Sequence, residues 1–204
     1  MSQAQKNLRG IVAMTLAMAF FALNDALVKL ARVHWDTGQI LVSRGVFALV
    51  ILTVWLALAR LGGQLPLLRH PKLLLRGVIE GFVACAFIAA LGAIPLAEIT
   101  TILMLAPMII TALSTVFFGE KVGWRRWSAI LVGFVGVMIA LRPSTQAFSW
   151  PAMIALAGSA SFAALMIITR SLRGTPDVVL TTAQFCGTLL FGIVVAPFGW
   201  ITPS

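Results

Sequence analysis

Hydrophobic residues occur along this chain in long runs that are separated by short polar gaps. A membrane-spanning helix needs about 20 mostly apolar residues, and seven runs approach or reach that length. They cover residues 11–30, 38–59, 73–94, 99–118, 127–141, 150–169 and 178–200, of which the fifth is the shortest. The pattern therefore predicts an all-α fold: a polytopic membrane helix bundle with seven transmembrane helices.

The composition supports a lipid environment. Of the 204 residues, 60% are hydrophobic and 10% are charged, whereas a soluble domain carries about 25% charged residues. No gap between the runs is long enough to hold a soluble domain, so any chemistry has to take place within or across the bilayer. The first expected partner is therefore the lipid bilayer itself.

Charge and reactive residue types exclude several classes of function. The net charge of +9 would suit a nucleic-acid partner, but the basic residues cluster in the short gaps, so no nucleic-acid binding is expected. His34 and His70 both fall in loops, and Cys85 and Cys186 both fall inside apolar runs. We therefore expect no disulfide, no metal site, no catalytic cluster and no cofactor.

The basic residues of the gaps are unevenly divided between the two membrane faces. One face receives eleven of them: Lys6, Arg9, Arg60, Arg69, Lys72, Arg76, Lys121, Arg125, Arg126, Arg170 and Arg173. The other face receives three: Lys29, Arg32 and Arg142. Because cytoplasmic loops carry the excess of Lys and Arg, we expect a multi-pass protein of the cell inner (plasma) membrane with its N-terminus in the cytoplasm.

A weak internal repeat relates the first two runs to the last two. Shifting the chain by 141 residues brings a basic–loop–acid landmark into register: Lys29 on Arg170, Arg32 on Arg173 and Asp36 on Asp177. The two copies start on opposite membrane faces because five runs separate their starts, as in the inverted repeats of secondary transporters. We expect a first repeat of five helices over residues 9–143 and a truncated second copy of two helices over residues 150–204.

One stretch of the chain carries a set of recurring sequence elements. Residues 91–143 read LGAIPLAEITTILMLAPMIITALSTVFFGEKVGWRRWSAILVGFVGVMIALRP. They include Pro-Leu-Ala-Glu before a helix, a mid-helix Ala-Pro, a Gly-Glu-Lys-Val turn, Trp-Arg-Arg-Trp, Gly-Phe-x-Gly-Val and a closing Arg-Pro. With FALNDALVK in the first run and LVSRGVFAL in the second, the chain resembles the EamA-type transporters of the drug/metabolite transporter superfamily.

The resemblance implies ten helices in two inverted halves, with both termini in the cytoplasm, and movement of small metabolites across the inner membrane. Helices eight to ten of that pattern have no counterpart here, so the chain is expected to be C-terminally incomplete. Similarity to carriers with the Asn-Asp…Lys pattern implies a substrate that is S-adenosylmethionine-like or riboflavin-like, with amino-acid-like compounds as a further class.

Four polar residues of the first two runs are candidates for a substrate pathway: Asn24, Asp25, Lys29 and Arg44. Asp25 and Arg44 each lie about six residues from the outer end of their runs, so they share one depth on antiparallel helices that rise 1.5 Å per residue. They can pair, since a lone charge there costs roughly 2.5–3.5 kcal/mol. The pair either lines the pathway or fixes helix packing. Lys29, one turn from Asp25, either shares its carboxylate or reaches the membrane interface.

The third run contains one carboxylate, Glu80, inside a pair of small residues, Gly77 and Gly81. A carboxylate within the membrane can carry a proton or act in gating, which makes Glu80 a candidate for proton coupling. The alternative is an ion pair with Arg76, one helical turn away. The two glycines predict a close helix approach, as do Gly133 and Gly136 in the fifth run.

The fourth run has a slightly polar face interrupted by a proline. Residues at steps of three and four form that face: Thr101, Met104, Met108, Thr111 and Thr115. Pro107 removes one backbone hydrogen bond and frees a carbonyl, which a membrane helix tolerates beside a cavity or another helix. The face therefore either lines the pathway or packs on neighbours. Gln184 in the last run lies one position before the repeat counterpart of Arg44 and is a further pathway candidate.

We interpret the chain as a secondary transporter that moves a small organic metabolite by alternating access. The alternative is an incomplete carrier without transport activity alone, unless a homo-oligomer completes the pathway. A seven-helix receptor of the opsin type is disfavoured because the last run has no charged residue. A membrane-embedded enzyme is disfavoured because the runs hold only scattered carboxylates, and we expect no enzymatic activity.

Overall fold

The computed structural model describes residues 3–60, 62–119, 123–141 and 149–201. These residues form the helices α1 (Gln3–Ala31), α2 (Thr37–Leu58), α3 (Pro71–Ala93), α4 (Leu96–Leu103), α5 (Ala106–Phe118), α6 (Trp124–Leu141), α7 (Trp150–Ser171) and α8 (Asp177–Val195). A 3-10 helix, η1 (Gly62–Arg69), joins α2 to α3, and a short one, η3 (Ala196–Phe198), follows α8. No strand occurs in this part of the chain, so the predicted all-α fold is confirmed.

Six of the expected spans are present as stretches that are long and apolar enough to cross a membrane. They are Asn7–Ala31, Thr37–Leu58, Pro71–Ala93, Leu96–Phe117, Trp150–Ser171 and Asp177–Phe198. The remaining expected span corresponds to α6, whose apolar part, Trp127–Gly136, is shorter. The seven expected passages are thus all helical, as in a polytopic membrane helix bundle.

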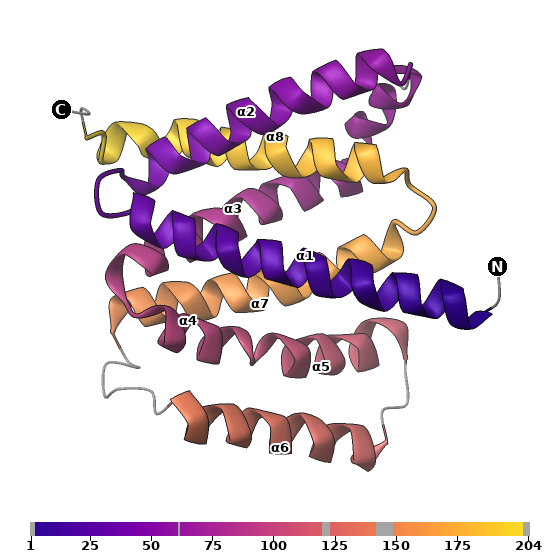
Figure 1. Cartoon of the computed structure of the whole chain (residues 1–204), viewed down its shortest axis with the longest axis vertical. Helices are drawn as coiled ribbons and strands as arrows, with labels where there is room; N and C mark the ends of the chain where they lie inside the picture. The colour runs from indigo at the N-terminus through magenta and orange to yellow at the C-terminus, as the bar shows by residue number, and fades with distance from the viewer. Residues whose placement is uncertain (1–2, 61, 120–122, 142–148, 202–204) are drawn as a thin grey trace.

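Consecutive passages run in opposite directions through the bundle (Figure 1). α1, α3, α6 and α8 run one way, and α2, α4 with α5, and α7 run the other, so the two termini lie at opposite ends. One end, called the basic end here, carries Arg60, Arg69, Lys72, Arg125 and Arg173. The opposite end, where residues 32–36 connect α1 to α2, is called the α1–α2 end.

Local sequence signals set several helix starts. Asp36 caps α2: its carboxylate accepts a hydrogen bond from the backbone N–H of Gly38 at 3.1 Å. The side-chain oxygen of Gln39 accepts a bond from the backbone N–H of Asp36 at 2.9 Å. This reciprocal capping box satisfies donors that the first turn of a helix leaves free. Pro71 and Pro151 lie in the first turns of α3 and α7, where the missing N–H of proline costs nothing.

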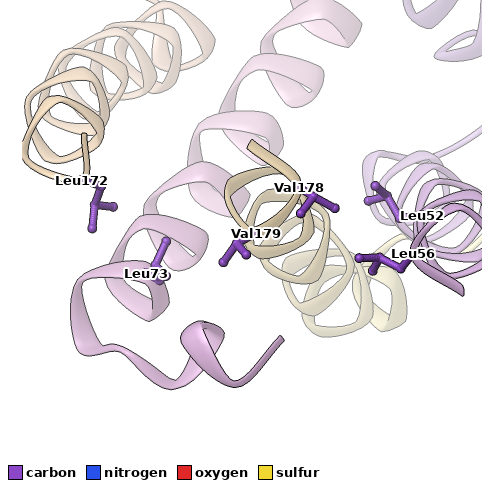
Figure 2. Packing of buried hydrophobic residues seen from close by; sticks show 6 residues of the cluster. All are labelled: Leu52, Leu56, Leu73, Leu172, Val178 and Val179. Atoms are coloured by element: carbon purple, nitrogen blue, oxygen red, sulfur yellow. The ribbon is translucent and has the colours of Figure 1, made fainter. Parts of the chain in front are cut away.

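α8 lies between α2 and α3 and packs extensively on both. One buried cluster joins residues of all three helices and of the α7–α8 connection: Leu52, Leu56, Leu73, Leu172, Val178 and Val179. Figure 2 shows Val178 directed toward the two leucines of α2, while its neighbour Val179 is directed toward Leu73 of α3. Adjacent residues of α8 thus pack on different helices, which fixes the position of α8 between them.

Glycines bring α3 and α8 close together. A Cβ atom on Gly77 would lie 2.8 Å from the carbonyl oxygen of Ala183, and a Cβ on Gly187 would overlap the carbonyl oxygen of Gly77. Membrane helices associate closely through such small residues because side-chain packing, rather than the hydrophobic effect, drives their contact. The prediction for Gly77 and Gly81 is confirmed. Gly133 and Gly136 have no neighbour within 4 Å in the described residues, so the close contact expected of them is wrong.

α1 and α6 lie at the periphery of the bundle. α1 packs mainly on α3, and its residues 7–23 are exposed. α6 packs on α4 and α5. A helix that is apolar and exposed in this way is suited to contact with lipid.

The loop between α1 and α2 and the loop between α7 and α8 lie at equivalent positions of the two predicted repeats. Residues 32–36 separate α1 from α2, and residues 172–176 separate α7 from α8, which agrees to one residue with the shift of 141. The division into repeats at 9–143 and 150–204 stays a prediction, since its boundary falls on residues 142–148, outside the described part of the chain.

Candidate functional site

Arg44 lies half-buried on α2. It is close enough to Asp25 of α1 and to Glu80 of α3 to attract both electrostatically. Over the described residues its guanidinium makes no hydrogen bond and no ion pair within 4.0 Å, and none of its nitrogens is sealed from the surface without a partner. Arg44 therefore presents accessible donors within a membrane span.

Asp25 does not form the direct ion pair with Arg44 that its depth predicted. Its carboxylate instead accepts a long hydrogen bond of 3.4 Å from the side-chain amide of Asn24. Both residues are half-buried. Matched depth fixes the height of two side chains but not the rotation of their helices, so Asp25 and Arg44 share a region without touching.

Lys29 has a role that neither of its predicted alternatives describes. Its ammonium donates hydrogen bonds to the carbonyl oxygens of Leu91 and, at 2.8 Å, of Ile94. These carbonyls belong to the last turn and the C-cap of α3, where the helix has acceptors without helical partners. A cation is favoured at this negative end of the helix dipole. Lys29 therefore fastens the end of α1 to the end of α3.

Glu80 forms the ion pair with Arg76 that was the structural alternative to proton coupling. Their nearest charged atoms are 3.8 Å apart. Arg76 also donates to the hydroxyl of Thr169 on α7 at 3.1 Å and to the carbonyl oxygen of Leu180 on α8 at 2.9 Å. One buried guanidinium thus joins α3, α7 and α8, and the carboxylate of Glu80 balances its charge.

The fourth expected span is broken at its proline. α4 ends at Leu103 and α5 begins at Ala106, so the helix is interrupted directly before Pro107. Beside the break, the hydroxyl of the fully buried Ser159 on α7 donates to the carbonyl oxygen of Ile102 at 3.3 Å. A neighbouring helix therefore satisfies an acceptor at the interruption, as membrane helices require.

The polar face expected across this break does not form one continuous stripe. Thr101 and Thr111 are buried, Met108 is half-buried, and Met104 is 43% exposed. The hydroxyls of Thr101 and Thr111 donate to carbonyl oxygens of their own helices, at Ala97 and Pro107. Both α4 and α5 pack on α7, which favours packing over lining of a pathway.

Gln184 lies half-buried on α8, the helix between α2 and α3. Its main-chain carbonyl accepts a bond from Thr188 at 3.0 Å. Two hollows are described in the bundle, of about 550 Å³ and about 210 Å³. Neither is lined by any of the predicted pathway residues.

Gln39 is a buried polar residue that the sequence analysis missed. Its side-chain amide donates to the carbonyl oxygen of Ile201 and accepts from the N–H of Ile201 at 3.2 Å. The same oxygen completes the α2 capping box. The sequence signal was the Asp36-x-x-Gln39 spacing, which is typical of a capping box but says nothing about the distant partner Ile201.

No group of three or more His, Cys, Asp or Glu residues that could hold a metal ion is found over the described ranges. The polar groups inside the bundle are instead single charges on different helices. They can bind a charged solute or stabilise helix contacts.

Comparison of the sequence with known proteins identifies its family. Residues 8–142 match the EamA-like transporter family. The chain is 33% identical over 133 residues to a riboflavin transporter of Rhizobium johnstonii, which covers 64% of this chain and 44% of that protein. It is 25% identical over 202 residues to an S-adenosylmethionine uptake transporter of Rickettsia prowazekii. The aligned region covers 97% of this chain and 67% of that protein. It is 29% identical over 156 residues to the pseudopaline exporter CntI of Pseudomonas aeruginosa. The aligned region covers 76% of this chain and 54% of that protein.

The matched regions thus span between 44% and 67% of these curated relatives. No solved structure matches the chain significantly. The matched family model covers most of the chain, which confirms the resemblance carried by residues 91–143 and points to a transporter rather than an enzyme. This multi-pass membrane helix bundle therefore belongs to the EamA-like transporter family.

Proposed function

We propose that the chain acts in secondary transport of a small organic metabolite by alternating access, with Arg44 binding an anionic group of the substrate. The observation that carries the proposal is the accessible guanidinium of Arg44, which attracts Asp25 and Glu80 electrostatically but forms no ion pair with either. An unpaired cation in a span is costly and marks a candidate ion or substrate pathway.

The chemistry of this arrangement favours a substrate that carries both signs of charge. A guanidinium matches a carboxylate with two parallel hydrogen bonds, and the carboxylate of Asp25, which Arg44 attracts electrostatically, can receive a cationic group. Two of the relatives are named for S-adenosylmethionine uptake and for riboflavin. We therefore propose an S-adenosylmethionine-like or amino-acid-like zwitterion first, with riboflavin-like compounds as the second class.

We further propose that the basic end faces the cytoplasm, which places the N-terminus there. Arg60, Arg69, Lys72, Arg125 and Arg173 gather at this end, and cytoplasmic loops carry the excess of positive charge. The inner membrane is the corresponding location. Labelling of single cysteines placed at Lys72 and at His34, in a background without Cys85 and Cys186, tests the orientation from either side of the membrane.

Proton coupling through Glu80 receives less support. Glu80 is paired with Arg76, which is itself bonded to Thr169 and Leu180. These contacts favour a role in packing, and the proposal assigns the substrate to Arg44 and Asp25 instead.

A thermal-unfolding screen of the purified chain in detergent tests the proposal. Ligand at one hundred times its dissociation constant should stabilise the protein by about 2.7 kcal/mol. The panel contains S-adenosylmethionine, riboflavin and amino acids, and uptake into proteoliposomes follows for any compound that stabilises. Arg44→Gln should abolish both effects. Arg44→Lys should weaken them, because it keeps the charge without the two-pronged geometry.

The matched control is Arg69→Gln, since Arg69 lies exposed in η1, which follows the end of α2 opposite to the end near Arg44. Unchanged binding and uptake in a folded Arg44→Gln protein would contradict the role of Arg44. A cooperatively melting chain that binds nothing and transports nothing would instead support the alternative of a carrier that is inactive alone. Recovery of uptake in crosslinked dimers would then point to a homo-oligomer.

A further inference from the structure

The larger hollow of the structure lies at the basic end between α2, η1 and α8. Its volume is about 550 Å³, and its walls include Leu52, Leu56, Leu65 and Thr182. The hydroxyl of Thr182 donates to the carbonyl oxygen of Val178 at 2.7 Å, so it offers no free donor to a ligand. Thr53 also lines the hollow, and its hydroxyl donates to the carbonyl oxygen of Leu49 at 2.7 Å. The interior of the hollow is therefore mostly apolar.

Among the described residues that line this hollow, Arg60 is the charged one. α2 ends at Leu58, so Arg60 follows the membrane span by two residues, at the level of the lipid headgroups. The side chain of Arg60 is exposed. An apolar hollow with a cation at the headgroup level matches the two parts of a phospholipid, an acyl chain and a phosphate.

The backbone of Arg60 supports a specific role for its side chain. Its φ angle is +55°, and it is the one non-glycine residue with positive φ in the described ranges. Glycine is the usual residue in this conformation after a helix, because a Cβ atom strains it. The chain has glycine at positions 62 and 63 but arginine at the strained position itself. Such an outlier is a reason to look for function.

The surrounding charge favours an anionic ligand. No Asp or Glu occurs between residues 37 and 79, and Arg69 and Lys72 follow at the same end. Basic residues at a membrane surface attract anionic lipids. No carboxylate of α2, η1 or the first part of α3 opposes that attraction. The α8 wall begins with one exposed acid, Asp177, which the bases Arg60, Arg69 and Lys72 outnumber at this end.

We propose that this hollow is a binding site for an anionic glycerophospholipid, with one acyl chain between α2, η1 and α8 and the phosphate bound by Arg60. The site is separate from Arg44 and does not depend on which metabolite the chain transports. Its occupant comes from the bilayer, since two of the walls of the hollow, α2 and α8, belong to helices that cross it.

Native mass spectrometry of the full chain, extracted with its lipids in polymer nanodiscs, tests the proposal. Wild-type protein should retain an anionic phospholipid, and Arg60→Gly should retain about fivefold less. Arg60→Lys should retain an intermediate amount. Glycine suits the backbone of position 60, so Arg60→Gly should melt at the same or a higher temperature, which separates lipid loss from misfolding.

A second pair of variants tests the hollow itself. Ala57 lines the hollow, so Ala57→Phe should fill it and expel the lipid, while Ala59→Phe, outside the lining, should leave the lipid in place. Equal retention in wild type, Arg60→Gly and Ala57→Phe would overturn the proposal. So would retention without preference for anionic over zwitterionic lipid. A lipid-free wild type that forms a dimer, lost in Ala57→Phe, would also overturn it and assign the hollow to a second copy of the chain.

Discussion

The ammonium of Lys29 lies 2.8 Å from the carbonyl oxygen of Ile94, which joins the last turn of α1 to the C-cap of α3. α1 is otherwise a peripheral helix whose residues 7–23 are exposed. The two hydrogen bonds from Lys29 to backbone carbonyl oxygens thus hold the end of α1 against the bundle at the α1–α2 end.

Lys29→Met should loosen this attachment. A hydrogen bond to a charged group contributes about 1.5–3 kcal/mol, and the carbonyls of Leu91 and Ile94 would lose their donor. We expect a lower free energy of unfolding by roughly that amount, measured by thermal or denaturant unfolding in detergent. Lys72→Met, at an exposed position of α3, is the control. Equal stability of the two variants would show that the Lys29 contact contributes nothing.

Arg76→Met should be more damaging because it removes bonds to two helices and leaves the half-buried Glu80 without its partner. Breaking a buried pair by removing one member costs about 3–5 kcal/mol. The double variant Arg76→Met with Glu80→Gln should recover part of this loss, and a double-mutant cycle measures the coupling. If Glu80→Gln gave no recovery, the ion pair would not be the reason for the loss.

Gly187→Ala should separate α3 from α8. A Cβ atom there would overlap the carbonyl oxygen of Gly77, and two backbones cannot yield as a flexible side chain can. We expect a loss of folded protein, measured by size-exclusion chromatography and thermal unfolding. Gly133→Ala on α6 is the matched control, because nothing lies within 4 Å of its added Cβ. Alanine should raise stability there by up to about 1 kcal/mol.

Gln39→Leu should release the segment after α8. The side-chain amide of Gln39 pairs with both backbone groups of Ile201, and leucine has the volume without the polar atoms. Hydrogen exchange at the amide of Ile201 should become faster, while exchange in the middle of α8 should not change. Unaltered exchange at Ile201 would show that the segment is held by other contacts.

Thr111→Val tests whether the fourth span lines the pathway. The hydroxyl of Thr111 donates to the carbonyl oxygen of Pro107 at 2.7 Å, so no free donor is removed from a cavity. We expect metabolite uptake within about twofold of wild type and a stability change below about 1 kcal/mol, the usual worth of one internal hydrogen bond. A large loss of uptake at unchanged stability would restore the pathway interpretation of this face.

The sequence predicted the helices and the family well, because both depend on local pattern. The apolar runs gave the spans to within a few residues, and the Gly77 and Gly81 pair correctly indicated a close helix contact. The separation of Asp25 from Arg44 could not be predicted, because it depends on the rotation of α1 against α2. The partners of Lys29 and Gln39 were also missed, since Leu91, Ile94 and Ile201 contribute backbone atoms that no side-chain pattern reveals.

The position of α8 between α2 and α3 has a consequence for the order in which the chain assembles. A ribosome releases α2 and α3 into the bilayer long before α8, so each waits there without its principal neighbour. Until then, the backbone of α3 at Gly77, which later contacts Gly187, has no helix packed against it. The early helices can insert one by one, but α2 and α3 reach the arrangement described here only when α8 arrives. A translation product that stops after α6 would leave the backbone of Gly77 open to contact with another membrane helix.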